Sequence, residues 1–177
     1  LQHLLYTATK VSHPMAIRYP RGSGIGITLD KELHSIPIGK AEILREGGDV
    51  AILAIGATVA PSLEAARQLA SEGIEPTVIN ARFAKPLDTK LILDMARRIK
   101  HIVTIEENAL KGGFGSAVAD LLRSSGLHEV QVTSIGIPDE FVEQGPQSVL
   151  RAKYGLDAQG IADKVMTIVQ SAVIARP

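Results

Sequence analysis

The chain has 177 residues, of which 45% are apolar and 3% are aromatic, so its core should be built from aliphatic side chains. Equal numbers of basic and acidic residues, 19 of each, argue against a nucleic-acid or membrane surface. The absence of cysteine excludes disulfides and thiolate metal sites, and no apolar run approaches the ~18 residues of a membrane span. Because the first residue is Leu, we expect a piece of a longer protein.

The first part of the chain predicts two short elements without a core of their own. Residues 1–8 (LQHLLYTA) carry apolar side chains at helical spacing but have no capping residue, so we expect the end of a helix that begins upstream. Residues 15–19 (MAIRY) predict a short strand, which Pro20 and Gly22 would end. A flexible glycine loop and a polar linker follow, up to Pro37.

From residue 38 the pattern alternates strands and helices. The predicted strands are residues 38–45, 50–56, 76–80, 101–108 and 130–136. Amphipathic helices follow the later strands, and Thr58, Asp88 and Asp157 are expected to cap three of them. This order predicts an α/β fold with a doubly wound, mostly parallel five-stranded sheet, helices on both faces, and one antiparallel edge strand at residues 38–45.

The strand at residues 101–108 ends in acidic groups and is followed by a glycine-rich turn. In an open α/β sheet, ligands bind at the carboxyl ends of strands. The turn at residues 112–115 (GGFG) allows either close backbone packing or a phosphate site, and the lack of a dinucleotide or P-loop motif favours packing. The pair Glu106 and Glu107 is either a catalytic dyad or a solvated rim or subunit contact. The second interpretation is favoured, because neighbouring strand residues point to opposite faces.

Other candidate sites have weaker support in the sequence. The spacing of the five histidines predicts no metal site; these are His3, His13, His34, His101 and His128. A flavodoxin-like nucleotide-binding domain would need several glycines after the first parallel strand, where residues 55–58 (IGAT) offer one. Ser116 lacks the surroundings of a nucleophilic serine.

Five motifs occur together in the order known from one enzyme family. They are residues 17–22 (IRYPRG), 82–88 (RFAKPLD), 103–108 (VTIEEN) with 112–116 (GGFGS), 136–141 (GIPDEF) and 154–161 (YGLDAQGI). Over nearly its whole length the chain resembles the carboxyl-terminal part of the 1-deoxy-D-xylulose-5-phosphate synthases, which are transketolase-like enzymes. The alternative is the C-terminal domain of another such enzyme, for example a 2-oxoacid dehydrogenase beta subunit. The first and fourth motifs favour the synthase.

The resemblance implies a transferase that uses thiamine diphosphate and Mg²⁺. Members of the family condense pyruvate with glyceraldehyde 3-phosphate, release carbon dioxide, and supply isoprenoid, thiamine and pyridoxal synthesis. Residues 1–36 would be the tail of the middle, pyrimidine-binding domain, and residues 37–177 the transketolase-like C-terminal domain. The expected partners are the rest of the same polypeptide and a second copy in a homodimer. The expected location is the bacterial cytoplasm, or a plastid if a transit peptide preceded the chain.

The same resemblance limits what this chain should do by itself. The motifs that hold the diphosphate, the metal and the catalytic Glu lie in family domains that this sequence does not contain. We therefore expect no catalytic, cofactor-binding or metal-binding residues in the chain, no bound thiamine diphosphate, and a structural or dimerisation role.

Arg21 is the candidate substrate-binding residue. In the family, the arginine of this motif binds the phosphate of glyceraldehyde 3-phosphate. A guanidinium is always charged and offers a planar fork of donors that matches phosphate oxygens. Pro20 stiffens the backbone before it, and Gly22 allows a close approach after it. Arg18 lies on the other side of the predicted strand, and we expect a structural role for it.

Overall fold

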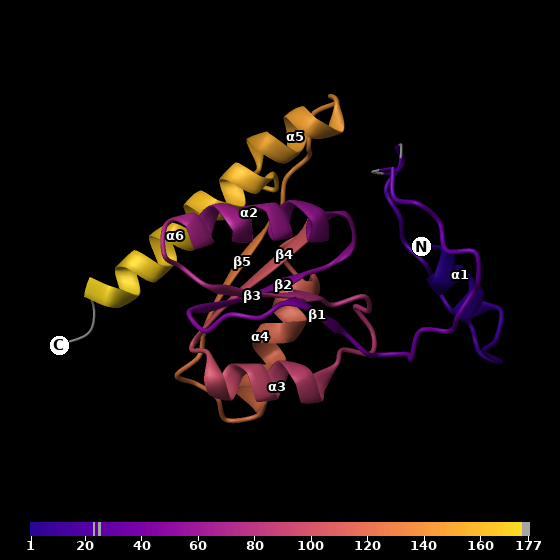
Figure 1. Ribbon diagram of the computed structural model, residues 1–177, viewed down its shortest axis with the longest axis horizontal. Coiled ribbons are helices and arrows are strands. Elements are labelled where there is room, and N and C mark those ends of the chain that lie inside the picture. The colour runs from indigo at the N-terminus through magenta and orange to yellow at the C-terminus, as the bar shows by residue number, and fades with distance from the viewer. Residues whose placement is uncertain (23, 25, 175–177) are drawn as a thin grey trace.

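A computed structural model describes residues 1–22, 24 and 26–174 of the chain, with side chains up to residue 171 (Figure 1). Its centre is a five-stranded sheet in the order β1-β3-β2-β4-β5. The strands are β1 (Glu42–Arg45), β2 (Val50–Ala54), β3 (Pro76–Asn80), β4 (His101–Ala109) and β5 (Gln131–Ile137). β1 runs antiparallel to β3, and the other neighbouring pairs are parallel. The predicted sheet and its antiparallel edge strand are therefore confirmed.

Helices cover both faces of this sheet, as Figure 1 shows. The helical elements are α1 (Gln2–Ala8), the 3-10 helix η1 (Gly56–Thr58), α2 (Val59–Ser71), α3 (Thr89–Arg98), α4 (Phe114–Ser124), α5 (Gln147–Lys153) and α6 (Ala158–Ile174). α2 and α6 pack on one face, and α3 and α4 pack on the other. None of the described helices is long and apolar enough to cross a membrane.

The central strand β2 shows how the sequence builds two cores at once. All five residues of β2 are fully buried. Val50 and Ile52 point to the core under α2 and α6, whereas Ala51 and Leu53 point to the core under α3 and α4. A strand that is buried on both faces has to be apolar throughout, which explains the unbroken run in the sequence.

Two of the three predicted helix caps are confirmed. The carboxylate of Asp88 accepts the backbone N–H of Leu91 at 3.2 Å at the start of α3, and Asp157 accepts that of Gly160 at 2.9 Å at the start of α6. The third prediction is wrong. Thr58 has helical dihedral angles, and its buried hydroxyl donates instead to the backbone oxygens of Ile55 and Ile105, both at 3.0 Å. It thereby joins η1 to β4.

The N-terminal segment, residues 1–36, lies beside the sheet, and the residues of it that the structure describes contribute no strand (Figure 1). The helix predicted there is confirmed as α1. The strand predicted at residues 15–19 is wrong, because the structure assigns no strand to this stretch. A strand needs the N–H and C=O groups of a neighbouring strand, and these five residues have no such neighbour in the described structure.

Candidate functional site at the carboxyl edge of the sheet

The carboxyl end of β4 holds a buried carboxylate. Glu106 is completely buried, and its two oxygens accept the backbone N–H groups of Phe114 and Gly115, each at 2.8 Å. The side-chain amide of Asn108 donates to the same carboxylate at 3.2 Å. Because Phe114 and Gly115 begin α4, the negative charge lies at the positive end of a helix dipole. The prediction of a solvated rim or subunit contact is therefore wrong for Glu106, whose burial is offset by these hydrogen bonds.

Two glycines at the following turn, Gly113 and Gly115, are required by close packing. A Cβ atom on Gly113 would lie 2.4 Å from the backbone oxygen of Ala109 and 2.5 Å from the carboxylate of Glu106. A Cβ atom on Gly115 would lie 2.4 Å from two hydroxyl oxygens, those of Thr104 and Ser134. The packing interpretation is thus confirmed. The helix N-terminus where a phosphate would bind is already taken by the protein's own carboxylate.

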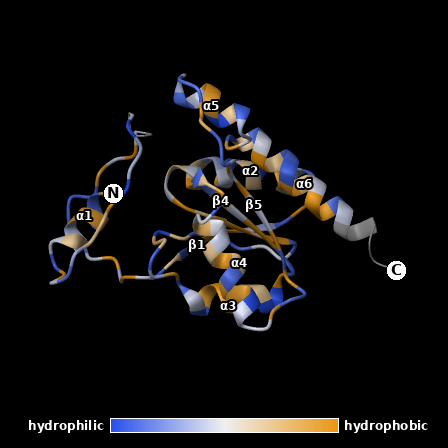
Figure 2. Cartoon of the chain, turned by 180° about the vertical axis from the view of Figure 1, so that it is seen from behind, coloured by the Kyte–Doolittle hydropathy of each residue, from blue (hydrophilic) through white to orange (hydrophobic). Residues whose placement is uncertain are grey.

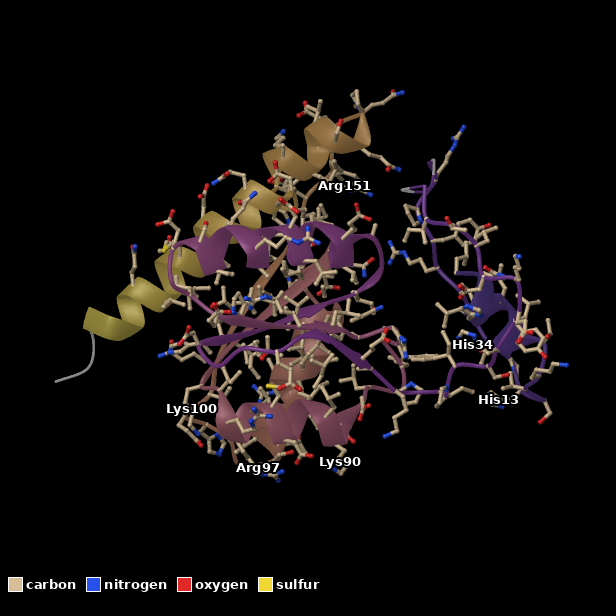
Figure 3. The ribbon with its side chains drawn as sticks, in the orientation of Figure 1. His13, His34, Lys90, Arg97, Lys100 and Arg151 are labelled. Atoms are coloured by element: carbon tan, nitrogen blue, oxygen red, sulfur yellow. The ribbon has the colours of Figure 1, made fainter. Side chains whose placement is uncertain are left out.

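Glu107 points to the opposite side of β4 and serves a different purpose. It pairs with the guanidinium of Arg151 on α5 at 2.5 Å, and each of the two side chains is 29% exposed. Figure 3 shows Arg151 on α5. The two glutamates therefore do not form a dyad, as the alternation of strand side chains predicts. Glu106 connects β4 to α4, and Glu107 connects β4 to α5.

A chain of polar contacts leads from this ion pair to Arg21. Arg151 also donates to the side-chain oxygen of Gln147 at 3.4 Å, and the amide nitrogen of Gln147 donates to the backbone oxygen of Arg21. Gln147 and Arg21 are 126 positions apart in the sequence. Arg21 is itself exposed, so its guanidinium is accessible to a ligand. The fold therefore brings the predicted substrate residue to the same side of the molecule as the end of β4.

Arg82, which follows β3, is a feature that sequence reasoning missed. Its φ of 57° lies in the left-handed region, which residues other than glycine rarely adopt. Its backbone N–H donates to the side chain of Asn80 at 3.2 Å, and its guanidinium pairs with Glu42 on β1. These contacts hold the strained residue in place. The sequence carried no signal for this, since an arginine between Ala81 and Phe83 does not indicate a positive φ.

Exposed ion pairs and hydrogen bonds surround the end of α5. The hydrogen bond from Lys153 lowers the pKa of the Glu143 carboxyl group, and the same contact raises the pKa of Lys153. The hydroxyl of Tyr154 donates to Glu140 at 3.0 Å, and this bond raises the pKa of the tyrosine. These groups keep the loop before α5 close to the helix.

Among these residues, Arg21 has an exposed side chain that an anion can reach. The helix N-terminus at the glycine turn, by contrast, is occupied by the carboxylate of Glu106.

Comparison with known proteins agrees with the fold. The family model described as "Transketolase, C-terminal domain" matches residues 39–161. The chain therefore belongs to the family of transketolase C-terminal domains. Its similarity to particular members is high. It is 63% identical over 92% of its length to 1-deoxy-D-xylulose-5-phosphate synthase 1 of Geobacter sulfurreducens, and 52% identical over 96% to the synthase of Dehalococcoides mccartyi strain BAV1. It spans about a quarter of these relatives, 25% and 27% of their lengths.

Solved structures resemble most of the chain. A structure titled as a split gene transketolase, inactive beta4 tetramer, is 37% identical, with a TM-score of 0.71, and the match covers 77% of this chain and 44% of that one. A transketolase from Campylobacter jejuni is 18% identical, with a TM-score of 0.53 over 73% of this chain and 18% of that one, which supports the fold alone.

Proposed function

We propose that this chain is the carboxyl-terminal part of a 1-deoxy-D-xylulose-5-phosphate synthase, which joins pyruvate to glyceraldehyde 3-phosphate with loss of carbon dioxide. The observation that carries the proposal is the 63% identity over 92% of the chain to a synthase of that name. In this assignment, residues 1–36 end the pyrimidine-binding domain, and residues 37–177 form the C-terminal domain. The sheet supports this division, because its first strand, β1, begins at Glu42, a few residues after the proposed boundary.

Thiamine diphosphate and Mg²⁺ belong to this proposal only as cofactors of the whole enzyme. We do not expect the diphosphate to bind at the N-terminus of α4, because the carboxylate of Glu106 occupies that position and would repel a second anion. The contribution of this chain is therefore structural, together with one substrate contact. We also expect this chain to contribute to the dimerisation of the whole enzyme.

Arg21 is the proposed contact to the phosphate of glyceraldehyde 3-phosphate. Its exposed guanidinium can donate two parallel hydrogen bonds to phosphate oxygens. Gln147 binds the backbone oxygen of Arg21, and Gln147 is in turn bound by Arg151, so the loop is connected to the rigid end of β4. The role of such a contact is to hold and orient the phosphorylated substrate. Pyruvate, which has no phosphate, would not depend on it.

A chimeric enzyme tests both the synthase assignment and the proposed role of Arg21. Residues 1–177 would replace the matching carboxyl-terminal part of the Geobacter sulfurreducens synthase, and product formation would be measured with both substrates varied. We expect an active chimera. Arg21→Ala should lower kcat/KM for glyceraldehyde 3-phosphate roughly 10- to 150-fold, since a hydrogen bond to a charged group contributes about 1.5–3 kcal/mol. The constant for pyruvate should change little. Arg21→Lys should recover part of the loss, because an ammonium group cannot make the forked contact.

Arg18→Ala is the matched control, because this exposed arginine lies three positions away in the same segment. It should leave both constants near those of the parent chimera. A folded chimera without activity would contradict the synthase assignment and favour another transketolase-like enzyme, such as a 2-oxoacid dehydrogenase beta subunit. An active chimera in which Arg21→Ala affects both substrates equally would contradict only the role of Arg21.

A further inference from the structure

The N-terminal segment brings together three side chains that are common metal ligands. They are His3 on α1 and, further along the segment, Asp30 and His34. One ligand atom from each residue lies within 4.8 Å of the other two. His3 and His34 are 31 positions apart, so their spacing in the sequence did not reveal the cluster. Figure 3 labels His34 in this segment.

Direct contacts between the three side chains hold the cluster together. His3 Nε2 lies 2.6 Å from Asp30 Oδ2. The rings of His3 and His34 stack with their centroids 3.5 Å apart and their planes inclined by 30°. Their imidazole and carboxylate groups are therefore close to one another before any ligand binds.

The backbone around the cluster is also anchored. Gln2 donates its side-chain amide to the backbone oxygen of Asp30 at 2.8 Å. The hydroxyl of Thr7, a residue that is 3% exposed, accepts the backbone N–H of Ile36 at 2.8 Å. These bonds fasten both ends of the stretch from Asp30 to Ile36 onto α1. The three side chains therefore lie near one another in the folded segment, and a bound ion would stabilise this arrangement further.

We propose that His3, Asp30 and His34 form a binding site for a divalent transition-metal ion of the Zn²⁺ type. Two imidazole nitrogens and one carboxylate oxygen are a ligand set that zinc accepts, with water in the fourth position. Mg²⁺ is not the expected ion, because it prefers a shell of oxygen ligands. The side chain of His3 is 17% exposed and that of Asp30 is 64% exposed, so an ion can reach the cluster from solvent.

Metal binding requires the three side chains to rearrange, including rotation of one of the stacked imidazole rings. Two ligand atoms on one tetrahedral zinc ion are about 3.3 Å apart, given bonds of about 2.0–2.1 Å, so the 2.6 Å contact between His3 and Asp30 has to open. The exposed carboxylate can move by this amount. The ion then replaces the hydrogen bond between these groups. The other ring nitrogen of His3 accepts the backbone N–H of His34 at 3.3 Å, a long bond that is given up if this nitrogen becomes protonated.

The proposal can be tested on this chain with Co²⁺ as a spectroscopic probe and Zn²⁺ as the competitor, at a pH above the ordinary pKa of histidine. The parent chain should bind one Co²⁺ ion with visible d–d absorption, which Zn²⁺ should abolish. His3→Ala, Asp30→Ala and His34→Ala should each weaken binding at least about tenfold. His13→Ala is the control, because this exposed histidine belongs to the same segment but not to the cluster, and it should bind as the parent does.

Circular dichroism should show that the variants keep the helix content of the parent chain, because the substituted residues lie outside the sheet domain, which holds most of the helices. Loss of binding in the three cluster variants, with binding retained in His13→Ala, would support the site. The proposal would be overturned if the parent chain did not bind Co²⁺. It would also be overturned if the three cluster variants bound Co²⁺ as tightly as the parent chain. The three residues would then form only a hydrogen-bonded link between α1 and the segment that follows.

Discussion

The N-terminal segment and the sheet domain are stabilised in different ways. The buried apolar residues begin at Val50, whereas Thr7 is the one buried residue among the described residues 1–36. The segment instead exposes large apolar side chains: Leu1, Leu5, Tyr19, Ile27, Leu29 and Leu33. Figure 2 shows apolar residues along α1 and the adjoining chain as well as in the sheet domain.

This difference explains which region can fold by itself. The sheet domain has two layers of helices and buries apolar surface on both faces of β2. The N-terminal segment relies on polar contacts, and its one hydrogen bond to the domain, among the described residues, joins Arg21 to Gln147. Polar contacts near water contribute little to stability, so this segment needs a further surface to cover its apolar residues. The remainder of the proposed enzyme would provide it.

The largest expected difference between the two regions is in hydrogen exchange. Amides of β2 and β4 should be protected on the order of 10⁴-fold or more, because they open only with the whole domain. Amides of α1 should be protected less than about tenfold in the monomeric, metal-free chain, since a helix of 7 residues with one buried residue is marginal. Exchange measured by NMR would check this. Strong protection across α1 in a monomer would mean that the segment folds without a partner.

Removal of the buried carboxylate should weaken the sheet domain most among single substitutions at the site. Glu106→Ala leaves two backbone N–H groups at the start of α4 without acceptors, and we expect a loss of about 2–4 kcal/mol in the free energy of unfolding. Urea denaturation provides the measurement. Glu107→Ala, which removes an ion pair on the opposite face of β4, should cost about 1 kcal/mol or less. Similar losses for the two variants would contradict the assigned difference in burial.

A single methyl group tests the packing of the glycine turn. Gly115→Ala would place Cβ 2.4 Å from the hydroxyl oxygens of Thr104 and Ser134, and the resulting shift should cost about 1–3 kcal/mol. Gly48→Ala is the control, because a Cβ atom there meets nothing within 4 Å, and it should change stability by about 0.5 kcal/mol or less. Thermal unfolding of both variants would show the contrast. A neutral Gly115→Ala would show that the turn has room for a side chain.

The smallest expected effect concerns the exposed pair of Glu143 and Lys153. The hydrogen bond from Lys153 lowers the pKa of Glu143, so this pair stabilises the fold above the unfolded pKa, and that contribution is lost as the pH falls through the folded pKa. Lys153→Gln should raise the pKa of Glu143 toward its ordinary value. NMR titration of the carboxyl group would detect this change. An unchanged pKa would show that solvent and salt screen the pair completely.

Sequence patterns predicted the elements of the sheet domain well, but they predicted poorly those features that depend on residues far away in the sequence. The N-caps Asp88 and Asp157 bind backbone groups only three positions away, and β2 is an unbroken apolar run. Both features could therefore be predicted from the sequence. Thr58 failed as a cap because the oxygens that bind its hydroxyl include one from β4, 47 positions away. The strand predicted at residues 15–19 failed for a related reason, since pairing requires a second strand.

The sequence by itself determined the alternation of strands and helices, the helices on both faces of the sheet and the glycine-rich turn after β4. These features follow from side-chain period and backbone sterics, which are local properties. Only the tertiary structure decided that Glu106 is buried while Glu107 pairs with α5, and that His3 lies against His34. Burial and long-range contacts depend on how separate elements pack, and no spacing along the chain records that packing.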